Sequence, residues 1–67
     1  MIVLERLNGH PVMLNCDLIE SVEESNGATV VTLTTGNAVV VSNGLDEIRE
    51  KVVEFKRRIH ASGATGA

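Results

Sequence analysis

The chain has almost no aromatic residues and only one cysteine. Of its 67 residues one is Phe, and neither Trp nor Tyr occurs. Proteins that bind single-stranded nucleic acids stack bases on aromatic side chains, so this chain cannot build such a platform. A lone cysteine, Cys16, excludes an internal disulfide, and a free thiol is typical of a reducing compartment. We therefore expect a cytoplasmic protein.

Metal-ligand spacing, long apolar runs and an excess of positive charge are also lacking. His10 and His60 lie far apart, and neither stands at zinc-ligand spacing from Cys16. No apolar run approaches the roughly 18 residues of a membrane span, and no secretory leader pattern is visible. The net charge is −3, whereas nucleic-acid binders present an excess of Lys and Arg. We expect no metal and no cofactor, we do not favour nucleic acid as a partner, and we expect membrane contact only through a partner protein.

The length of the chain limits its core. A single domain of 67 residues buries so little apolar surface that the gain roughly equals the entropic cost of ordering the chain. With disulfides and metals excluded, self-association is the remaining source of stability, and we expect a homo-oligomer. A domain of this size also has little room for a ligand pocket of the usual size, about 300–1,000 Å³.

Turn signals divide the first two thirds of the chain into short β segments. Asn8-Gly9 and Asn26-Gly27 are typical of type I′ hairpin turns, because both residue types tolerate positive φ. Thr35-Gly36-Asn37 predicts a third turn, and the polar triplet Asn15-Cys16-Asp17 predicts a corner between strands. The strands expected between these signals cover residues 2–7, 12–14, 18–24, 29–34 and 38–41.

The last expected strand differs from the others because it is apolar on both faces. Val39, Val40 and Val41 follow one another without a polar residue. Such a run is typical of a strand covered on both sides. We expect the helix to cover one face and a second chain the other, which makes these three valines the candidates for self-association.

After Ser42-Asn43-Gly44 the apolar period changes from two to about 3.5 residues, which predicts an amphipathic helix. Asn43 with Asp46 resembles a capping box. The apolar stripe of this helix consists of Leu45, Ile48, Val52, Phe55 and Ile59. The predicted fold is a small β-rich α+β domain over residues 1–60, an antiparallel meander of about five short strands plus one C-terminal helix, followed by a flexible tail at residues 61–67.

Charged residues gather in two places, and neither place looks catalytic. Glu20, Glu23 and Glu24 form an acidic cluster, which we interpret as a solvated face with an electrostatic docking patch as the alternative. The basic run Lys56-Arg57-Arg58 suits the C-terminal end of the helix dipole, and it could also bind an acidic partner. No nucleophile stands beside a base, so we expect no enzymatic activity.

An ordered set of short motifs along the chain is more specific than any of its parts. It resembles the FlbD/SwrD family of small bacterial flagellar proteins from about Ile2 to Ile59. The motifs that carry the resemblance are Leu7-Asn8-Gly9, Leu14-Asn15, Asp17-Leu18-Ile19-Glu20, Val30 to Leu33, Thr35-Gly36, Val39 to Val41 and Phe55-Lys56-Arg57.

The resemblance implies a cytoplasmic accessory protein at the flagellar base. Such a protein supports flagellar motor power and swarming by protein–protein contact, with partners in the stator and motor apparatus. The family supplies no catalytic residues. The candidate partner-docking residues are Asn15, Asp17, Glu20, Lys56, Arg57 and Arg58.

The alternative function is that of an RNA-binding post-transcriptional regulator similar to the carbon storage regulator family. Those proteins share the layout of five short strands and a C-terminal helix. That mode of RNA binding needs basic side chains on an edge strand and near the start of the helix. The chain offers Arg6 on the first strand, but Arg49 follows two acidic residues at the helix start, and the acidic net charge counts against this alternative.

Overall fold

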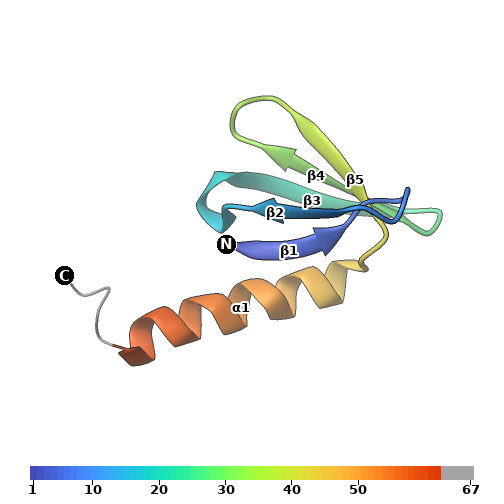
Figure 1. Ribbon diagram of the computed structural model, residues 1–67. Helices are drawn as coiled ribbons and strands as arrows, with labels where there is room; N and C mark the ends of the chain where they lie inside the picture. Colours follow the sequence, from blue (N-terminus) through green and yellow to red (C-terminus); the bar gives the residue numbers. More distant parts are fainter. Residues whose placement is uncertain (63–67) are drawn as a thin grey trace.

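The computed structural model describes residues 1–62, with side chains described through residue 59 (Figure 1). It confirms the α+β class, with five antiparallel strands followed by one C-terminal helix. The elements are β1 (Ile2–Glu5), β2 (Pro11–Leu14), the 3-10 helix η1 (Cys16–Leu18), β3 (Ile19–Ser25), β4 (Ala28–Leu33), β5 (Ala38–Val41) and α1 (Leu45–Ser62). The helix continues two residues into the segment predicted as a tail, and the rest of that segment, residues 63–67, lies outside the described residues.

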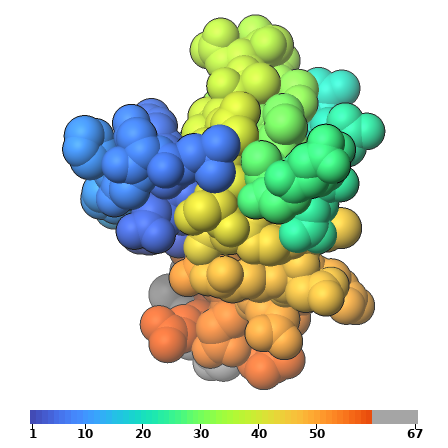
Figure 2. All heavy atoms as spheres, turned by 90° about the vertical axis from the view of Figure 1, so that its right-hand side faces the viewer, coloured from blue at the N-terminus to red at the C-terminus, as the bar shows by residue number. Residues whose placement is uncertain are grey.

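The strands form two sheets rather than one continuous meander. β1 pairs with β2, and β3, β4 and β5 form a second antiparallel sheet in that order. An isolated bridge between Arg6 and Val41 joins the two sheets. Figure 2 shows the β1–β2 hairpin in blue and the β3–β4 hairpin in green on either side of β5 in yellow, above α1.

The polar corner predicted at residues 15–17 separates the two sheets. Asn15 caps η1, because its side chain accepts a hydrogen bond of 2.9 Å from the amide of Asp17. The amide of Leu18 donates to the Asn15 carbonyl at 3.0 Å and completes the turn. This corner carries the chain away from β2, so β3 pairs with β4 instead.

The two Asn-Gly turns differ in geometry. Asn26 and Gly27 both have positive φ, +52° and +80°, and Ser25 pairs with Ala28. This confirms the predicted two-residue type I′ turn. At the first hairpin the type I′ prediction was wrong, because only Gly9 has positive φ.

The first hairpin closes instead with a three-residue loop. The amide of Arg6 donates to the His10 carbonyl, and the amide of Gly9 donates back to the Arg6 carbonyl, each at 2.9 Å. The Asn8 side chain accepts a bond of 3.0 Å from the His10 amide, which holds Asn8 out of the left-handed region. The turn around Gly36 repeats this backbone pattern between residues 33 and 37.

A β-bulge in β3 changes which side chains face the core. Ile19 pairs with Leu33, but the next partner pair is Ser21 with Thr32, so Glu20 is an extra residue in β3. Strict alternation places Ile19 and Val22 on opposite faces. With the bulge, both side chains pack against the core, contrary to what strict alternation predicts from the sequence.

The core is formed where α1 lies beneath the sheets (Figure 1). Ile48 is only 2% exposed, and Val52 and Phe55 pack beside it half-buried, which confirms most of the predicted helical stripe. Leu45, at 40% exposure, does not belong to the buried face. The seven buried apolar residues come from every element except β3: Ile2, Leu4, Leu14, Cys16, Val31, Val41 and Ile48.

The three valines of β5 have different surroundings. Val41 is fully buried, Val39 is half-buried and Val40 is 41% exposed. One face of the strand therefore lies against the core, while the face that carries Val40 lacks a cover within the described chain. Self-association through this face stays a prediction.

The junction between β5 and α1 is fixed by Asn43. Its Oδ1 accepts a bond of 2.6 Å from the Glu5 amide, and its Nδ2 donates to the Glu47 carboxylate at 2.8 Å. Its carbonyl accepts a bond of 2.7 Å from the hydroxyl of Thr29, a buried residue in β4. The predicted capping box was wrong, because the Asn43 side chain binds β1 and the first helical hydrogen bond runs from Ile48 to Gly44.

Asn43→Ala should lower the free energy of unfolding by about 1–2 kcal/mol, because the Glu5 amide loses its acceptor. Urea denaturation followed by circular dichroism measures the change. Asn37→Ala is the matched control, because Asn37 lies in an exposed loop and only its main chain is hydrogen-bonded. Equal effects of the two substitutions would contradict the role assigned to Asn43.

Candidate functional site

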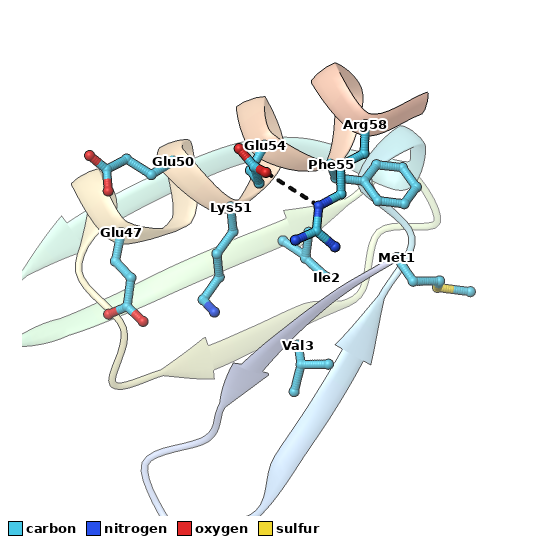
Figure 3. A pocket seen from close by; sticks show the side chains of 9 residues that line it. All are labelled: Met1, Ile2, Val3, Glu47, Glu50, Lys51, Glu54, Phe55 and Arg58. Carbon is cyan, nitrogen blue, oxygen red and sulfur yellow. Dashed lines mark hydrogen bonds and ion pairs between the residues drawn. The ribbon is translucent and has the colours of Figure 1, made fainter. Parts of the chain in front are cut away.

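The helix packs through a narrow stripe and leaves an open groove along each of its sides. The β1 groove lies between α1 and β1 and has a volume of about 510 Å³ (Figure 3). The β3 groove lies between α1 and the β3 side of the sheet and has a volume of about 390 Å³. Both hollows are open to the surface and are not enclosed pockets. The expectation that so small a domain has little room for a ligand pocket stays a prediction.

The β1 groove is apolar at its base and charged along the helix. Met1, Ile2 and Val3 at the start of the chain line it together with Phe55 of α1. Figure 3 shows Glu47 and Lys51 reaching from α1 toward β1, with Glu50 pointing away. Along this rim Glu54 forms an ion pair with Arg58, and the Glu47 carboxylate accepts a hydrogen bond from the Asn43 side chain.

The β3 groove is almost entirely apolar. Arg49 is its one charged lining residue among those described. The apolar lining residues are Cys16, Ile19, Val22, Leu45, Ile48, Val52 and Val53. Of these, Leu45 and Val53 are exposed, at 40% and 47%. Sequence reasoning missed this groove, although the spacing of residues 45, 49 and 53 along one side of a helix was a usable signal.

Two of the predicted docking residues, 39 positions apart, meet in an ion pair. The Lys56 Nζ lies 2.8 Å from Asp17 Oδ1, and both side chains are exposed. The hydrogen bond to Lys56, with its positive charge, lowers the pKa of Asp17 below its ordinary 3.8. The same bond and the Asp17 charge raise the pKa of Lys56 above 10.5. Because Asn15 caps the turn that carries Asp17, these three candidates form one surface.

The other three docking candidates lie apart from this surface. Arg57 and Arg58 both pair with Glu54, at 3.6 and 3.2 Å, so their charge is partly neutralised. Glu20 is exposed at the β-bulge of β3. The structure therefore links Asn15, Asp17 and Lys56, and it leaves the remaining three in separate places.

The surfaces described above present apolar and charged side chains. Within the described residues no group of three or more His, Cys, Asp or Glu side chains is placed to hold a metal ion. Cys16 is buried and lies beside apolar neighbours. Apolar contact and ion pairing are what the two grooves offer. No helix in residues 1–62 is both long and apolar enough to cross a membrane.

Large hydrophobic side chains are unusually exposed for so small a domain. Among the described residues, seven apolar side chains are buried and eight large ones are exposed. The exposed ones are Met1, Val3, Leu7, Met13, Leu18, Val40, Leu45 and Val53. Val3 and Met13 pair directly across the outer face of β1 and β2. Such surface is typical of contact with other proteins.

These observations define the class of the protein. It is a small β-rich α+β domain with two open grooves and exposed apolar surface. The profile of the FlbD family, described as flagellar and swarming motility proteins, matches residues 1–60. The chain belongs to this family and is a protein of flagellar and swarming motility. Neither the curated proteins nor the solved structures contain a match to it.

Asp17→Asn should lower stability slightly at neutral pH, because it removes the carboxylate that Lys56 binds. The lowered pKa of Asp17 makes its contribution complete above about pH 3.8 and lost as pH falls through the folded value. The raised pKa of Lys56 makes its contribution complete below about pH 10.5 and lost as pH rises further. The difference in stability between wild type and Asp17→Asn should therefore vanish at both low and high pH.

Urea midpoints at pH 2.5, 7 and 11.5 measure this difference. Glu23→Gln serves as the control, because the Glu23 side chain is exposed on β3 and makes no ion pair with any described residue. A difference between wild type and Asp17→Asn that stays constant across the three pH values would contradict the ion-pair explanation.

Proposed function

We propose that this chain is a non-enzymatic accessory protein that supports flagellar motor power, and thereby swarming, by contacting partner proteins. Family membership over residues 1–60 carries the motility part of this proposal. The contact part is supported by eight exposed large hydrophobic side chains and by grooves whose lining offers apolar and ionic contacts. The proposed partners belong to the stator and motor apparatus, and contact with them would bring the protein to the flagellar base.

RNA binding gains no support from the arrangement of charge. Three of the six cationic residues, Lys56, Arg57 and Arg58, are paired with carboxylates of the chain itself. Binding to RNA would have to break these pairs or rely on the three others. Of these, Arg6 follows β1, and Arg49 and Lys51 lie on α1 but line different grooves. Affinity for phosphate backbones depends on clustered free cations.

Deleting the gene should reduce the torque of single flagellar motors while filaments remain present. A bead attached to a filament stub measures torque, and staining of the same cells counts filaments. Expression of the wild-type chain from a second site should restore torque. Normal torque in the deletion strain would contradict the motor-power proposal, and an RNA titration at low salt would then test the regulator alternative.

We further propose self-association through the Val40 face of β5. Val40 is exposed beside its partner Val30 on β4, and this face has no cover within the described chain. Covering it would add apolar burial to a domain whose core holds seven side chains.

Val40→Lys should shift the protein from oligomer toward monomer, because a cation in this face cannot be buried against its copy. Sedimentation velocity at about 100 µM, far above the range of specific association at nM to µM Kd, measures the mass. Leu7→Lys is the control, since Leu7 is exposed in the first hairpin loop. A wild-type chain that sediments as a monomer would refute this proposal.

A further inference from the structure

The β3 groove has one unbalanced charge. Lys56, Arg57 and Arg58 each lie within 3.6 Å of a carboxylate oxygen. The Arg49 side chain makes no ion pair or hydrogen bond with any described residue, although it lines a hollow that is otherwise apolar. A guanidinium in such surroundings is suited to a carboxylate, which it can bind through two parallel hydrogen bonds.

The two most exposed apolar residues of the groove flank this cation. Leu45 and Val53 lie four residues before and after Arg49, on the same side of α1. At 1.5 Å per residue they are about 12 Å apart. A surface that complements this side of the helix therefore carries a carboxylate between apolar side chains, which is the pattern of an acidic amphipathic segment.

A second copy of this chain fits the groove poorly. A symmetric dimer that packs α1 antiparallel to its copy, with Leu45 against Val53, places Arg49 against Arg49. Two like charges in a closed apolar contact are unfavourable. The groove also spans one side of a single helix, whereas a stable dimer covers about 800 Å² on each partner. The groove fits a segment better than it fits a whole domain.

We propose that the β3 groove docks an acidic amphipathic segment of a partner protein. Apolar side chains of that segment pack against Leu45, Val52 and Val53, and one of its carboxylates pairs with Arg49. This inference rests on the proposed function, which requires contact with a partner protein. It adds the surface of this chain that makes the contact and the chemistry of the partner segment.

Photo-crosslinking in motile cells tests the inference. The chain carries a benzoylphenylalanine at position 53, alone or together with Arg49→Glu or Lys51→Glu. Lys51→Glu is the matched control, because it makes the same charge change on the same helix but on the side of the β1 groove. We expect a product with one protein, reduced about tenfold or more by Arg49→Glu, since like charges oppose docking, and retained with Lys51→Glu.

Mass spectrometry of the product identifies the docked segment. We expect an Asp or Glu within one helical turn of the crosslinked apolar residue. Changing that acid to Arg should restore the product with Arg49→Glu, and this rescue also shows that the Arg49→Glu chain is folded. Failure of the rescue, a product with a second copy of this chain, a segment without an acid, or no product would each overturn the inference.

Motor torque in the same strains separates the two proposals. If deletion of the gene lowers torque but Arg49→Glu leaves both torque and crosslinking unchanged, the groove inference fails and the proposed function stands. If deletion leaves torque normal while crosslinking depends on Arg49 as expected, the motor-power proposal fails and the docking surface stands.

Discussion

Hydrogen bonds of one residue, Asn43, determine how the helix is placed against the two sheets. Its side chain joins the Glu5 amide of β1 to the Glu47 carboxylate of α1, and its carbonyl accepts from Thr29 in β4. The Ser42 amide adds a bond of 2.8 Å to the Glu5 carbonyl. In a domain with seven buried apolar residues, these polar links hold the elements in one orientation. That orientation sets the position of both grooves beside α1.

Local chemistry was enough to predict much of the fold. The type I′ turn at Asn26-Gly27 and the corner at Asn15 follow from side chains that act within two or three residues. The helical stripe follows from its period. The division into two sheets depends instead on the bridge between Arg6 and Val41, 35 positions apart, and the bulge at Glu20 depends on its register with β4. Neither the division into two sheets nor the bulge can be predicted from a local sequence pattern.

The surface that brings together Asn15, Asp17 and Lys56, the proposed docking residues, was predictable only residue by residue. Asp17 and Lys56 stood out individually, but their pairing joins a corner to a helix 39 positions later. Most residues of the family motif also have structural roles: Gly9 and Gly36 supply positive φ, and Asn15 caps η1. The motif therefore identifies the fold. The β3 groove is formed largely by residues outside the motif, such as Arg49 and Val53.

The two contacts that fix α1 couple the folding of the domain to the docking proposed at the β3 groove. Asn43 anchors the start of α1, and the Lys56–Asp17 pair anchors its fourth turn to η1. Between these two anchors only Ile48 is fully buried, and Leu45 and Val53 remain exposed. A partner segment docked against Leu45 and Val53 would add apolar contact to the part of the helix that is least buried. It would bind only the folded chain. With the proposed docking, mass action would make the stability of the domain depend on the concentration of the partner, so a chain with so small a core would gain stability wherever that partner is abundant.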